Sequence, residues 1–333
     1  MRPRVSLIAL AGALGKVTVT LTDMASRYGL TTDQITAKTG VTGLRRLASD
    51  ESLVELGADV ARRVLAAHGV GLDQVRGVFG SSNPTAETLL PTFTALVANA
   101  VGLRNVIVDH VGVGCCGGLQ AMRNACNQLI VDALAGRVSF YLLVVGDQTS
   151  RILDPQRKQT GTLFSEGVSV ALLTNAPGVR HGYLVEAIGT KSLLGEALQS
   201  LRLRNPYAGD VHPLEMEGAK VFEFGEHIFE HFLDLVGNDI PQNCYIVPHQ
   251  SNLRMLEAMT RVAGLSPDQV YVDGTRTIGN TSPAAALLGL EDALRRGLVK
   301  APVPVLLGAF GAELQVGAAR LRSLGDPQRM LVA

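Results

Sequence analysis

The sequence predicts an α/β protein built from two copies of one strand–helix unit. Short β-branched or aromatic runs alternate with helical patterns along the whole 333-residue chain. The order strand, helix, strand, Gly-rich turn, helix, strand runs over residues 75–146 and returns over residues 243–309. We therefore expect two halves, residues 1–175 and 176–333, each with a mostly parallel sheet covered by helices.

The composition fits a large globular protein and excludes several classes. The chain is 47% hydrophobic, and 30 Lys and Arg residues balance 30 Asp and Glu residues. The zero net charge argues against nucleic-acid binding, which usually needs a basic face. Four cysteines, without a CxxC or a His/Cys cluster, predict no disulfide framework and no metal, and indicate a reducing cytosol. Charges or glycines interrupt each later apolar run, so we expect no membrane span.

The first eleven residues allow two interpretations. Met1-Arg2-Pro3-Arg4 ahead of the apolar residues 5–11 is typical of a short signal peptide with Ala9-Leu10-Ala11 as its cleavage site. A first buried strand ending at Gly12 accounts for the same residues. We favour the strand, because the apolar stretch is at the lower limit of length for a signal peptide.

The remaining elements follow from their periodicity. In the first half we expect strands at residues 75–79, 105–108 and 140–145, and helices at residues 53–68, 93–101 and 119–134. In the second half we expect strands at residues 243–247, 269–272, 304–307 and 315–321, and helices at residues 252–263 and 283–296. Residues 191–240, rich in charge and aromatic side chains, are expected to form an excursion that covers a site.

Cys116 is the first candidate site residue. It belongs to a cysteine pair between glycines, after an apolar run at residues 106–108 and before the helical pattern at residues 119–134. A thiol at a helix N-terminus is close to the positive end of the helix dipole, which favours its thiolate. The glycines permit a sharp turn and the close approach of a substrate. A buried structural cysteine is the alternative, which the turn glycines and two distant segments make less favoured.

Those two segments contain His249 and Asn280. His249 ends a strand at a Pro-His step, the end at which open α/β sheets place their ligands. Asn280 lies in a glycine-bearing turn before a helix that begins near Pro283, in the second-half counterpart of the cysteine turn. Each has an ordinary alternative: a structural or surface histidine, and an asparagine that caps the helix.

Together, the three residues suit thioester chemistry. Cys116 supplies a soft nucleophile, and His249 and Asn280 can each donate a hydrogen bond to a developing enolate or carbonyl oxygen. A papain-like protease also uses Cys, His and Asn, but there the histidine is the activating base. A duplicated α/β architecture would be unexpected for such a protease.

These segments resemble the thiolase superfamily, and within it the β-ketoacyl-acyl-carrier-protein synthase III group. The resemblance covers essentially the whole chain and is carried by Cys116-Gly117-Gly118-Leu119, Val247-Pro248-His249-Gln250-Ser251-Asn252-Leu253-Arg254, Gly279-Asn280-Thr281-Ser282 and Ala309-Phe310-Gly311. It implies a thiolase-like duplicated fold in α-β-α-β-α layers. It also implies a homodimeric acyltransferase that needs no cofactor and uses acyl thioesters of coenzyme A or acyl carrier protein.

The resemblance also implies roles for individual residues. Cys116 would take the acyl group, and His249 and Asn280 would stabilise the enolate of a malonyl-type thioester as carbon dioxide leaves. The backbone N–H groups of Cys116 and Ala312 would form the oxyanion hole. Leu90 would reach into the partner's acyl pocket, and Asn252 would hold the pantetheine arm. Phe222, Gln34 and Lys38 would also contact the substrate. Arg254 would dock the acidic carrier protein.

Several positions depart from the pattern of that group. The usual three glycines are replaced by Gly311-Ala312-Glu313, Gln34 stands in place of an adenine-stacking tryptophan, and Leu90 replaces a bulky aromatic residue. The family's Gly-Asp-Gly-Ala-Gly stretch is here residues 165–169, Ser-Glu-Gly-Val-Ser. These departures favour a specialised role, such as polyketide, quinolone or pyrone assembly, over primary fatty-acid initiation.

Three hypotheses therefore remain. The first is decarboxylative Claisen condensation of an acyl-enzyme with a malonyl or β-ketoacyl thioester. The second is acyl transfer to a hydroxyl or amine without decarboxylation, with His249 as the base. The third is a non-catalytic partner subunit, against which the intact Cys, His and Asn set argues.

Overall fold

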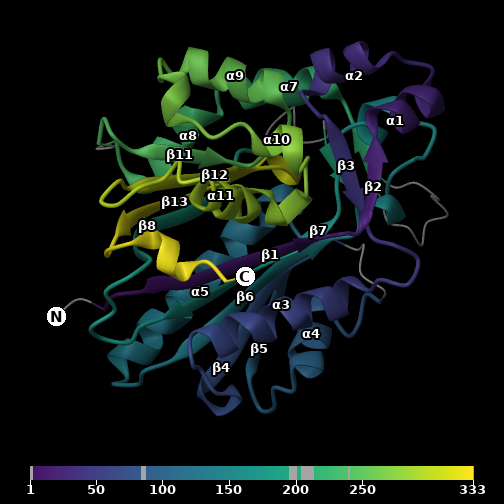
Figure 1. Cartoon of the computed structure of the whole chain (residues 1–333). Coiled ribbons are helices and arrows are strands. Elements are labelled where there is room, and N and C mark those ends of the chain that lie inside the picture. Colours follow the sequence, from purple (N-terminus) through teal and green to yellow (C-terminus); the bar gives the residue numbers. More distant parts are fainter. Residues whose placement is uncertain (1–2, 84–87, 195–200, 204–213, 239–240, 333) are drawn as a thin grey trace.

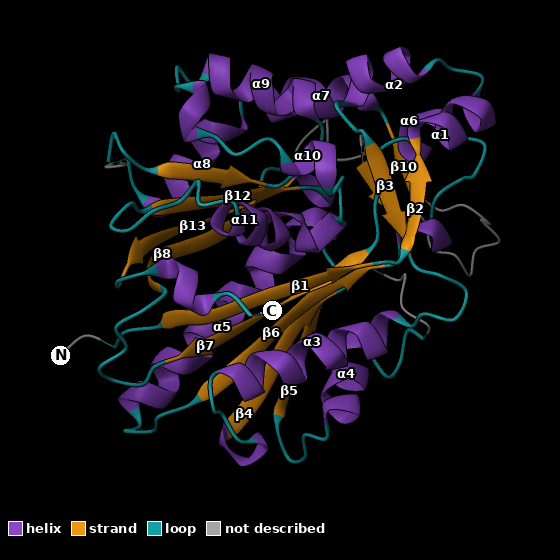
Figure 2. Ribbon diagram, viewed as in Figure 1, coloured by secondary structure: helices purple, strands orange, loops and turns teal. Residues whose placement is uncertain are grey.

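The core of the protein is one large sheet. The computed structural model describes residues 3–83, 88–194, 201–203, 214–238 and 241–332, with residues 201–203 and Glu313 described by their backbone alone. Nine strands hydrogen bond in the order β11-β12-β13-β8-β1-β7-β6-β4-β5 (Figure 1, Figure 2). These strands are β1 (Ser6–Leu14), β4 (Val75–Ser81), β5 (Ile107–Val111), β6 (Phe140–Asp147), β7 (Gly167–Thr174), β8 (Tyr183–Ser192), β11 (Tyr245–Pro248), β12 (Val305–Phe310) and β13 (Gln315–Ser323).

The α/β class is confirmed, but the sheet is mixed where two mostly parallel sheets were expected. Among the described strands, β4 with β5, β4 with β6 and β11 with β12 pair in parallel, and the central pairs are antiparallel. The two halves join because β1 pairs with β7 on one side and, through Ser6 and Leu7, with β8 on the other. The apolar run near the N-terminus is therefore a strand in the middle of the sheet.

Helices lie in three layers around these strands. One outer layer, α3 (Leu53–Ala67) and α4 (Phe93–Val101), packs on β1, β4, β6 and β7. The central layer, α5 (Gly117–Leu134) and α11 (Ala285–Arg295), shares one core with strands of both halves. The other outer layer includes α8 (Ile228–Val236) and α9 (Leu253–Val262), which pack on β11, β12 and β13. Figure 1 shows the strands of the second half above those of the first, with α11 between them.

One expected strand is absent. Residues 269–272 form only an isolated parallel bridge, between Ile246 and Val270, within the described part of the chain. A 3-10 turn over Pro267–Gln269 comes immediately before, and α10 (Gly274–Thr277) begins immediately after. The segment is too short to extend a ladder between those two turns, although its sequence is β-branched and aromatic.

Two excursions reach the end of the sheet that holds the site. The first contains β2 (Val17–Thr20), α1 (Leu21–Tyr28), α2 (Thr32–Thr39) and β3 (Gly43–Arg46). Capping boxes of Thr20 with Asp23 and of Thr31 with Gln34 fix the N-termini of its helices. The second contains the antiparallel strand pair β9 (Leu201–Leu203) and β10 (Leu214–Met216), and α7 (Gly218–Glu226). The short helix α6 (Lys158–Gly161) belongs to the separate connection between β6 and β7. Parts of the excursion expected at residues 191–240 lie outside the described residues.

A buried carboxylate, Asp132, anchors the C-terminal end of α5. Only 1% of its side chain is exposed, and it accepts hydrogen bonds from Ser139 Oγ (2.6 Å), Tyr141 OH (2.5 Å) and Arg137 Nη2 (2.8 Å). Burial by itself raises the pKa of Asp132, but these donors outweigh it and lower that pKa to about 2. Because Tyr141 belongs to β6, the carboxylate ties α5 to the sheet.

We predict that Asp132→Asn destabilises the protein mainly above pH 4. The folded-state pKa lies below the ordinary value of 3.8, so the carboxylate stabilises the fold above that value, and the stabilisation is lost as pH falls toward 2. The free energy of unfolding, from urea titrations at several pH values, should be about 2 kcal/mol lower for the variant at pH 7. The difference should shrink toward pH 2. A difference independent of pH would contradict this account.

Candidate active site

The cysteine turn is shaped by its contact with the second half of the chain. After β5, the chain forms a 3-10 turn over Gly114–Cys116 and enters α5 at Gly117. Gly114 has φ +63°, and a Cβ there would lie 3.0 Å from Ala312 Cβ and 3.1 Å from Ala312 N. A side chain at position 114 would therefore strain the backbone and separate the two segments.

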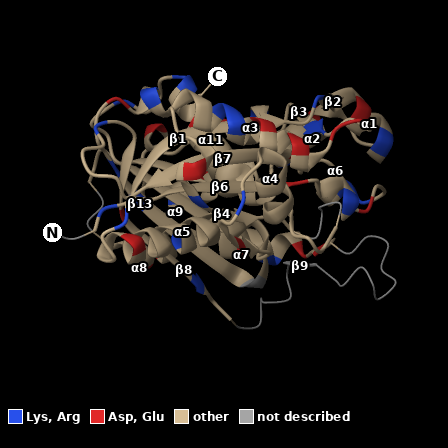
Figure 3. Cartoon of the chain, turned by 90° about the horizontal axis from the view of Figure 1, so that it is seen from below, with Lys and Arg blue, Asp and Glu red and all other residues tan. Residues whose placement is uncertain are grey.

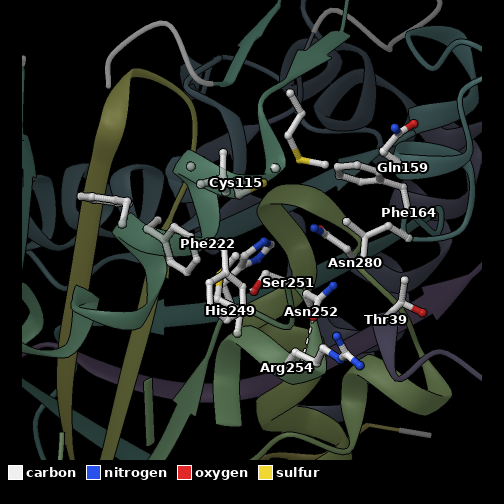
Figure 4. A pocket seen from close by; sticks show the side chains of 18 of the residues that line it. Thr39, Cys115, Gln159, Phe164, Phe222, His249, Ser251, Asn252, Arg254 and Asn280 are labelled. Carbon is white, nitrogen blue, oxygen red and sulfur yellow. Dashed lines mark hydrogen bonds between the residues drawn. The ribbon is translucent and has the colours of Figure 1, made fainter. Parts of the chain in front are cut away.

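This turn directs the two adjacent thiols to different sides. Cys115 is partly exposed and lines the main cavity of the protein, together with His249 and Asn280 (Figure 4). Cys116 is fully buried, with its Sγ 2.8 Å from where a Cβ on Gly317 would be. Successive residues of a 3-10 turn differ by about 120° in direction, so only one of the two can face the cavity. The prediction that Cys116 faces His249 and Asn280 is wrong, and Cys115 takes that place.

His249 enters the cavity from the end of β11. Its backbone N–H donates to Gly308 O at 2.7 Å, and its ring lies edge-on to that of Phe310 with the centroids 6.0 Å apart. The side chain is 2% exposed, and its Nδ1 has no partner among the described residues. Burial lowers the pKa of His249 to about 3, so the imidazole is neutral at physiological pH and offers one N–H donor.

Asn280 is held by three hydrogen bonds in its turn. Its backbone N–H donates to Leu163 O (3.1 Å), and its backbone carbonyl accepts from the N–H of Ser165 (2.8 Å). Its side-chain Oδ1 accepts from the N–H of Ser282 at 2.9 Å. Because Oδ1 is engaged, the Nδ2 group is the part of the carboxamide available to a ligand in the cavity. Figure 4 shows Cys115, His249 and Asn280 around the same space.

The predicted oxyanion-hole segments also meet here. A Cβ on Gly311 would lie 2.8 Å from the backbone nitrogen of Cys115, so the 311–312 segment packs against the Cys115 amide. The Cys116 amide was expected in this place, and the change follows from the rotation of the turn. Ala312 begins the 3-10 turn Ala312–Leu314 and lines the contact with Gly114. The side chain of Glu313 lies outside the described part of the chain.

The cavity has a volume of about 520 Å³ and two chemically different walls. Helices α7 and α9, with the end of β12, supply an apolar wall that includes Val221, Phe222, Phe224, Met255 and Phe310. The opposite wall is polar and comes largely from α2, α6 and the start of α9. Its residues include Lys38, Thr39, Gln159, Thr162, Asn252 and Arg254. Phe222, Asn252, Lys38 and Arg254 thus line the cavity.

A second hollow of about 400 Å³ continues from the polar wall. Lys38 and Arg254 line both, and Gln34 and Lys158 line only the second. We call this second hollow the cationic mouth, because Lys38, Lys158 and Arg254 line it. Figure 3 shows basic and acidic positions interspersed at this end of the molecule, on α1 and beside α6.

Two residues that were predicted to contact the substrate, Gln34 and Asn252, already make hydrogen bonds within the protein. Gln34 Oε1 accepts from the N–H of Thr31 in the capping box of α2. Asn252 Oδ1 accepts from the N–H of Arg254, which caps α9, and its Nδ2 donates to Lys38 O at 3.3 Å. Asn252 keeps one N–H for a ligand, whereas the oxygen of Gln34 is committed to the helix cap.

Leu90 lies outside the cavity of the single chain. It is 81% exposed and is followed by Pro91 through a cis peptide bond. Ile107 and Val108, on the edge strand β5, are 41% and 43% exposed. Exposed apolar side chains beside an unpaired strand edge are typical of an interface. The reach of Leu90 into a partner's pocket stays a prediction.

The rest of the structure bears on two other expectations. No helix in the described residues is long and apolar enough to cross a membrane. Within the same residues, no three His, Cys, Asp or Glu side chains are grouped so that they could hold a metal ion. Cys115, Cys116, Cys126 and Cys244 are all free thiols.

Comparison with known proteins identifies the family of the chain. Residues 110–192 match the model of 3-oxoacyl-[acyl-carrier-protein (ACP)] synthase III, and residues 239–323 match the model of its C-terminal part. Together, the two matches span just over half of the chain. The β-ketoacyl-[acyl-carrier-protein] synthase III of Pectobacterium atrosepticum is 28% identical over 304 residues, which cover 90% of this chain and 93% of that protein.

Solved structures show the same fold. The 3-oxoacyl-(acyl carrier protein) synthase III of Pseudomonas aeruginosa PAO1 superposes with a TM-score of 0.84 at 24% identity, covering 96% of this chain and 98% of that one. The priming β-ketosynthase of the R1128 polyketide pathway superposes with a TM-score of 0.82 at 23% identity, covering 98% of both chains. These likenesses confirm the thiolase-like fold class. The chain belongs to the 3-oxoacyl-[acyl-carrier-protein] synthase III family of acyltransferases.

Proposed function

We propose that the protein takes an acyl group from a thioester onto Cys115 and condenses it with a malonyl-type or β-ketoacyl thioester. The observation that carries this proposal is the shared cavity. A thiol at the start of α5, a neutral imidazole and a fixed carboxamide line it together. The partners would be thioesters of acyl carrier protein or coenzyme A, and no cofactor is needed.

The acylation step exchanges one thioester for another. Burial raises the pKa of the Cys115 thiol to about 12, so the resting group is the neutral thiol. The positive end of the α5 dipole opposes this effect as negative charge develops on sulfur. The sulfur attacks the acyl carbon, the carbon–sulfur bond to the donor breaks, and the thiol proton ends on the departing thiol. The backbone amides of Cys115 and Ala312 stabilise the tetrahedral oxyanion.

The condensation step depends on hydrogen-bond donors to the enolate oxygen more than on a general base. Loss of carbon dioxide from a malonyl thioester leaves an enolate, whose oxygen accepts hydrogen bonds from the His249 N–H and Asn280 Nδ2. The enolate carbon then attacks the acyl carbon on Cys115, and the cysteine sulfur leaves. His249 suits this role because burial keeps it neutral. A histidine with so low a pKa is a weak base, and this favours condensation over simple acyl transfer to a hydroxyl or amine.

The biological setting is a further part of the proposal. The replaced glycines, the missing tryptophan and the large apolar wall of the cavity support a specialised pathway, such as polyketide, quinolone or pyrone assembly, over primary fatty-acid initiation. The exposed Leu90 and the β5 edge support a homodimer. Four free thiols support a cytosolic enzyme. Arg254, at the cationic mouth, is the proposed contact for the acidic carrier protein.

Cys115, and not Cys116, should carry the acyl group. Intact-protein mass spectrometry after exposure to a panel of acyl thioesters should show one added acyl mass in the wild type and in Cys116→Ser, and none in Cys115→Ser. Digestion should place the acyl group on Cys115. Acylation lost in Cys116→Ser but retained in Cys115→Ser would restore the first assignment. A folded wild type that takes no label from acyl thioesters or iodoacetamide would favour a non-catalytic subunit.

His249→Ala and Asn280→Ala should slow condensation but not acylation. Each variant removes one donor to the enolate oxygen, which costs about a hundredfold in rate. Carbon dioxide release and product mass, measured after preloading Cys115, test this directly. Wild-type rates in both variants would exclude the proposed mechanism. An ester or amide product formed without carbon dioxide would establish the acyltransferase alternative.

The imidazole of His249 should stay neutral throughout the working pH range. Because its pKa is lowered to about 3, protonation at pH 5 to 8 would require the fold to open. Nitrogen-15 NMR of labelled histidine, with His249→Gln to assign the signal, should show one protonated and one unprotonated ring nitrogen from pH 8 to pH 5. A titration near pH 6.5 would show instead that the ring can act as a base.

A further inference from the structure

A buried polar chain lies behind Cys115, and no step above uses it. Asp147, at the end of β6, is completely buried and accepts from Asn83 through the backbone N–H at 2.8 Å and through Nδ2 at 2.5 Å. Asn83 Nδ2 also donates to Ser282 Oγ at 3.0 Å. Ser282 Oγ in turn lies 3.9 Å from Cys115 Sγ, within hydrogen-bond range for sulfur. The chain therefore runs from a carboxylate to the thiol of the active site.

The orientation of the Asn83 carboxamide is settled by its partners. Its Oδ1 accepts from the N–H of Gly114 at 3.0 Å, and an amide N–H can donate only to an oxygen that accepts. The nitrogen must therefore be the atom that faces Asp147 and Ser282, which removes the usual ambiguity of amide assignment. Both hydrogens of Nδ2 are then directed, one to the carboxylate and one to the serine hydroxyl.

This orientation fixes the direction of the Ser282 hydroxyl. Because Ser282 Oγ accepts from Asn83, its own proton points away from Asn83, and Cys115 Sγ is its other hydrogen-bond partner among the residues that the structure describes. The backbone of Ser282 is also unusual, with φ +55° in the left-handed region. A non-glycine residue in that region is strained, and such strain gathers at functional sites. The N–H of Ser282 donates to Asn280 Oδ1, so the same residue orients the carboxamide of the site.

We propose that Ser282 donates a hydrogen bond to the sulfur of Cys115, and that Asn83 and Asp147 are positioning residues that aim its hydroxyl. This role rests on the proposed function, in which that sulfur first attacks and later leaves. In both steps negative charge collects on sulfur, and a donor aimed at it stabilises the charge. Ser282 thus touches a reacting atom, whereas Asn83 and Asp147 act through it.

The groups around Cys115 determine how loss of the Ser282 hydroxyl should change the pKa of the thiol. Burial raises the pKa of the thiol, the negative charge of Asp147 adds to that rise, and the hydrogen bond from Ser282 lowers it. His249 on the facing segment is neutral, and Cys116 beside it is a buried thiol near Arg123. The side chain of Glu313 on the packed 312–314 turn lies outside the described residues. Removal of the serine hydroxyl should therefore raise the pKa of Cys115.

The test is the pH dependence of Cys115 alkylation in Ser282→Ala and Ser282→Gly. Iodoacetamide reacts with the thiolate, and mass analysis of digests separates Cys115 from the other three cysteines. We expect the alkylation rate constant of Cys115 in both variants to be about tenfold lower than in the wild type at each pH from 7 to 9. Asn83→Ala, which frees the hydroxyl to turn, should lower the rate constant by less.

Two comparisons separate this role from general damage to the fold. Glycine relieves the strain at φ +55° and alanine does not, so Ser282→Gly should melt at a higher temperature than Ser282→Ala while showing the same fall in alkylation rate constant. Thr281→Val removes a neighbouring buried hydroxyl that has no partner among the described residues, and it should leave the alkylation rate constant of Cys115 unchanged. Wild-type rate constants in both Ser282 variants would overturn the proposal. Alkylation needs no acyl substrate, so this result is independent of whether condensation occurs.

Discussion

The close packing of the cysteine turn against the 311–312 segment is the constraint on which the site depends. Position 114 has room for glycine alone, with Ala312 about 3 Å from where a side chain would begin, and position 311 is equally tight against the Cys115 amide. Since these segments are nearly 200 residues apart in sequence, the contact exists only when the two halves are packed. The backbone nitrogens of Cys115 and Ala312 both lie at this contact, and the same turn brings Cys115 into the cavity.

Burial sets the protonation of His249 and Cys115. It lowers the pKa of His249 and raises that of Cys115, so the resting site holds a neutral imidazole and a neutral thiol. In the proposed reaction, negative charge develops on the Cys115 sulfur or on a substrate oxygen. Fixed donors are effective at such a moment because they are already oriented and need not reorganise. The neighbourhood of Cys115 accordingly contains an amide, a carboxamide and a hydroxyl that hydrogen bonds hold in place.

The sequence predicted what depends on local chemistry and missed what depends on packing. His249 and Asn280 were predicted because each follows a recognisable strand or turn and precedes a helix, and both line the cavity. The choice between Cys115 and Cys116 depends on the rotation of a 3-10 turn, which is set by Ala312 and has no local signal. The strand expected at residues 269–272 failed because two flanking turns override its β propensity. The link from Asp147 to Ser282 spans distant segments, so no local pattern could reveal it.

The cationic mouth bears on which donor the site prefers. Lys38, Lys158 and Arg254 can bind the phosphate that coenzyme A and a carrier protein share at the end of the pantetheine arm. Discrimination must therefore come from what lies beyond that phosphate. No tryptophan exists to stack on adenine, and the oxygen of Gln34 is held in the helix cap. An adenine would find little to hold it, whereas an acidic protein surface would complement the cations, so we favour a carrier-bound donor.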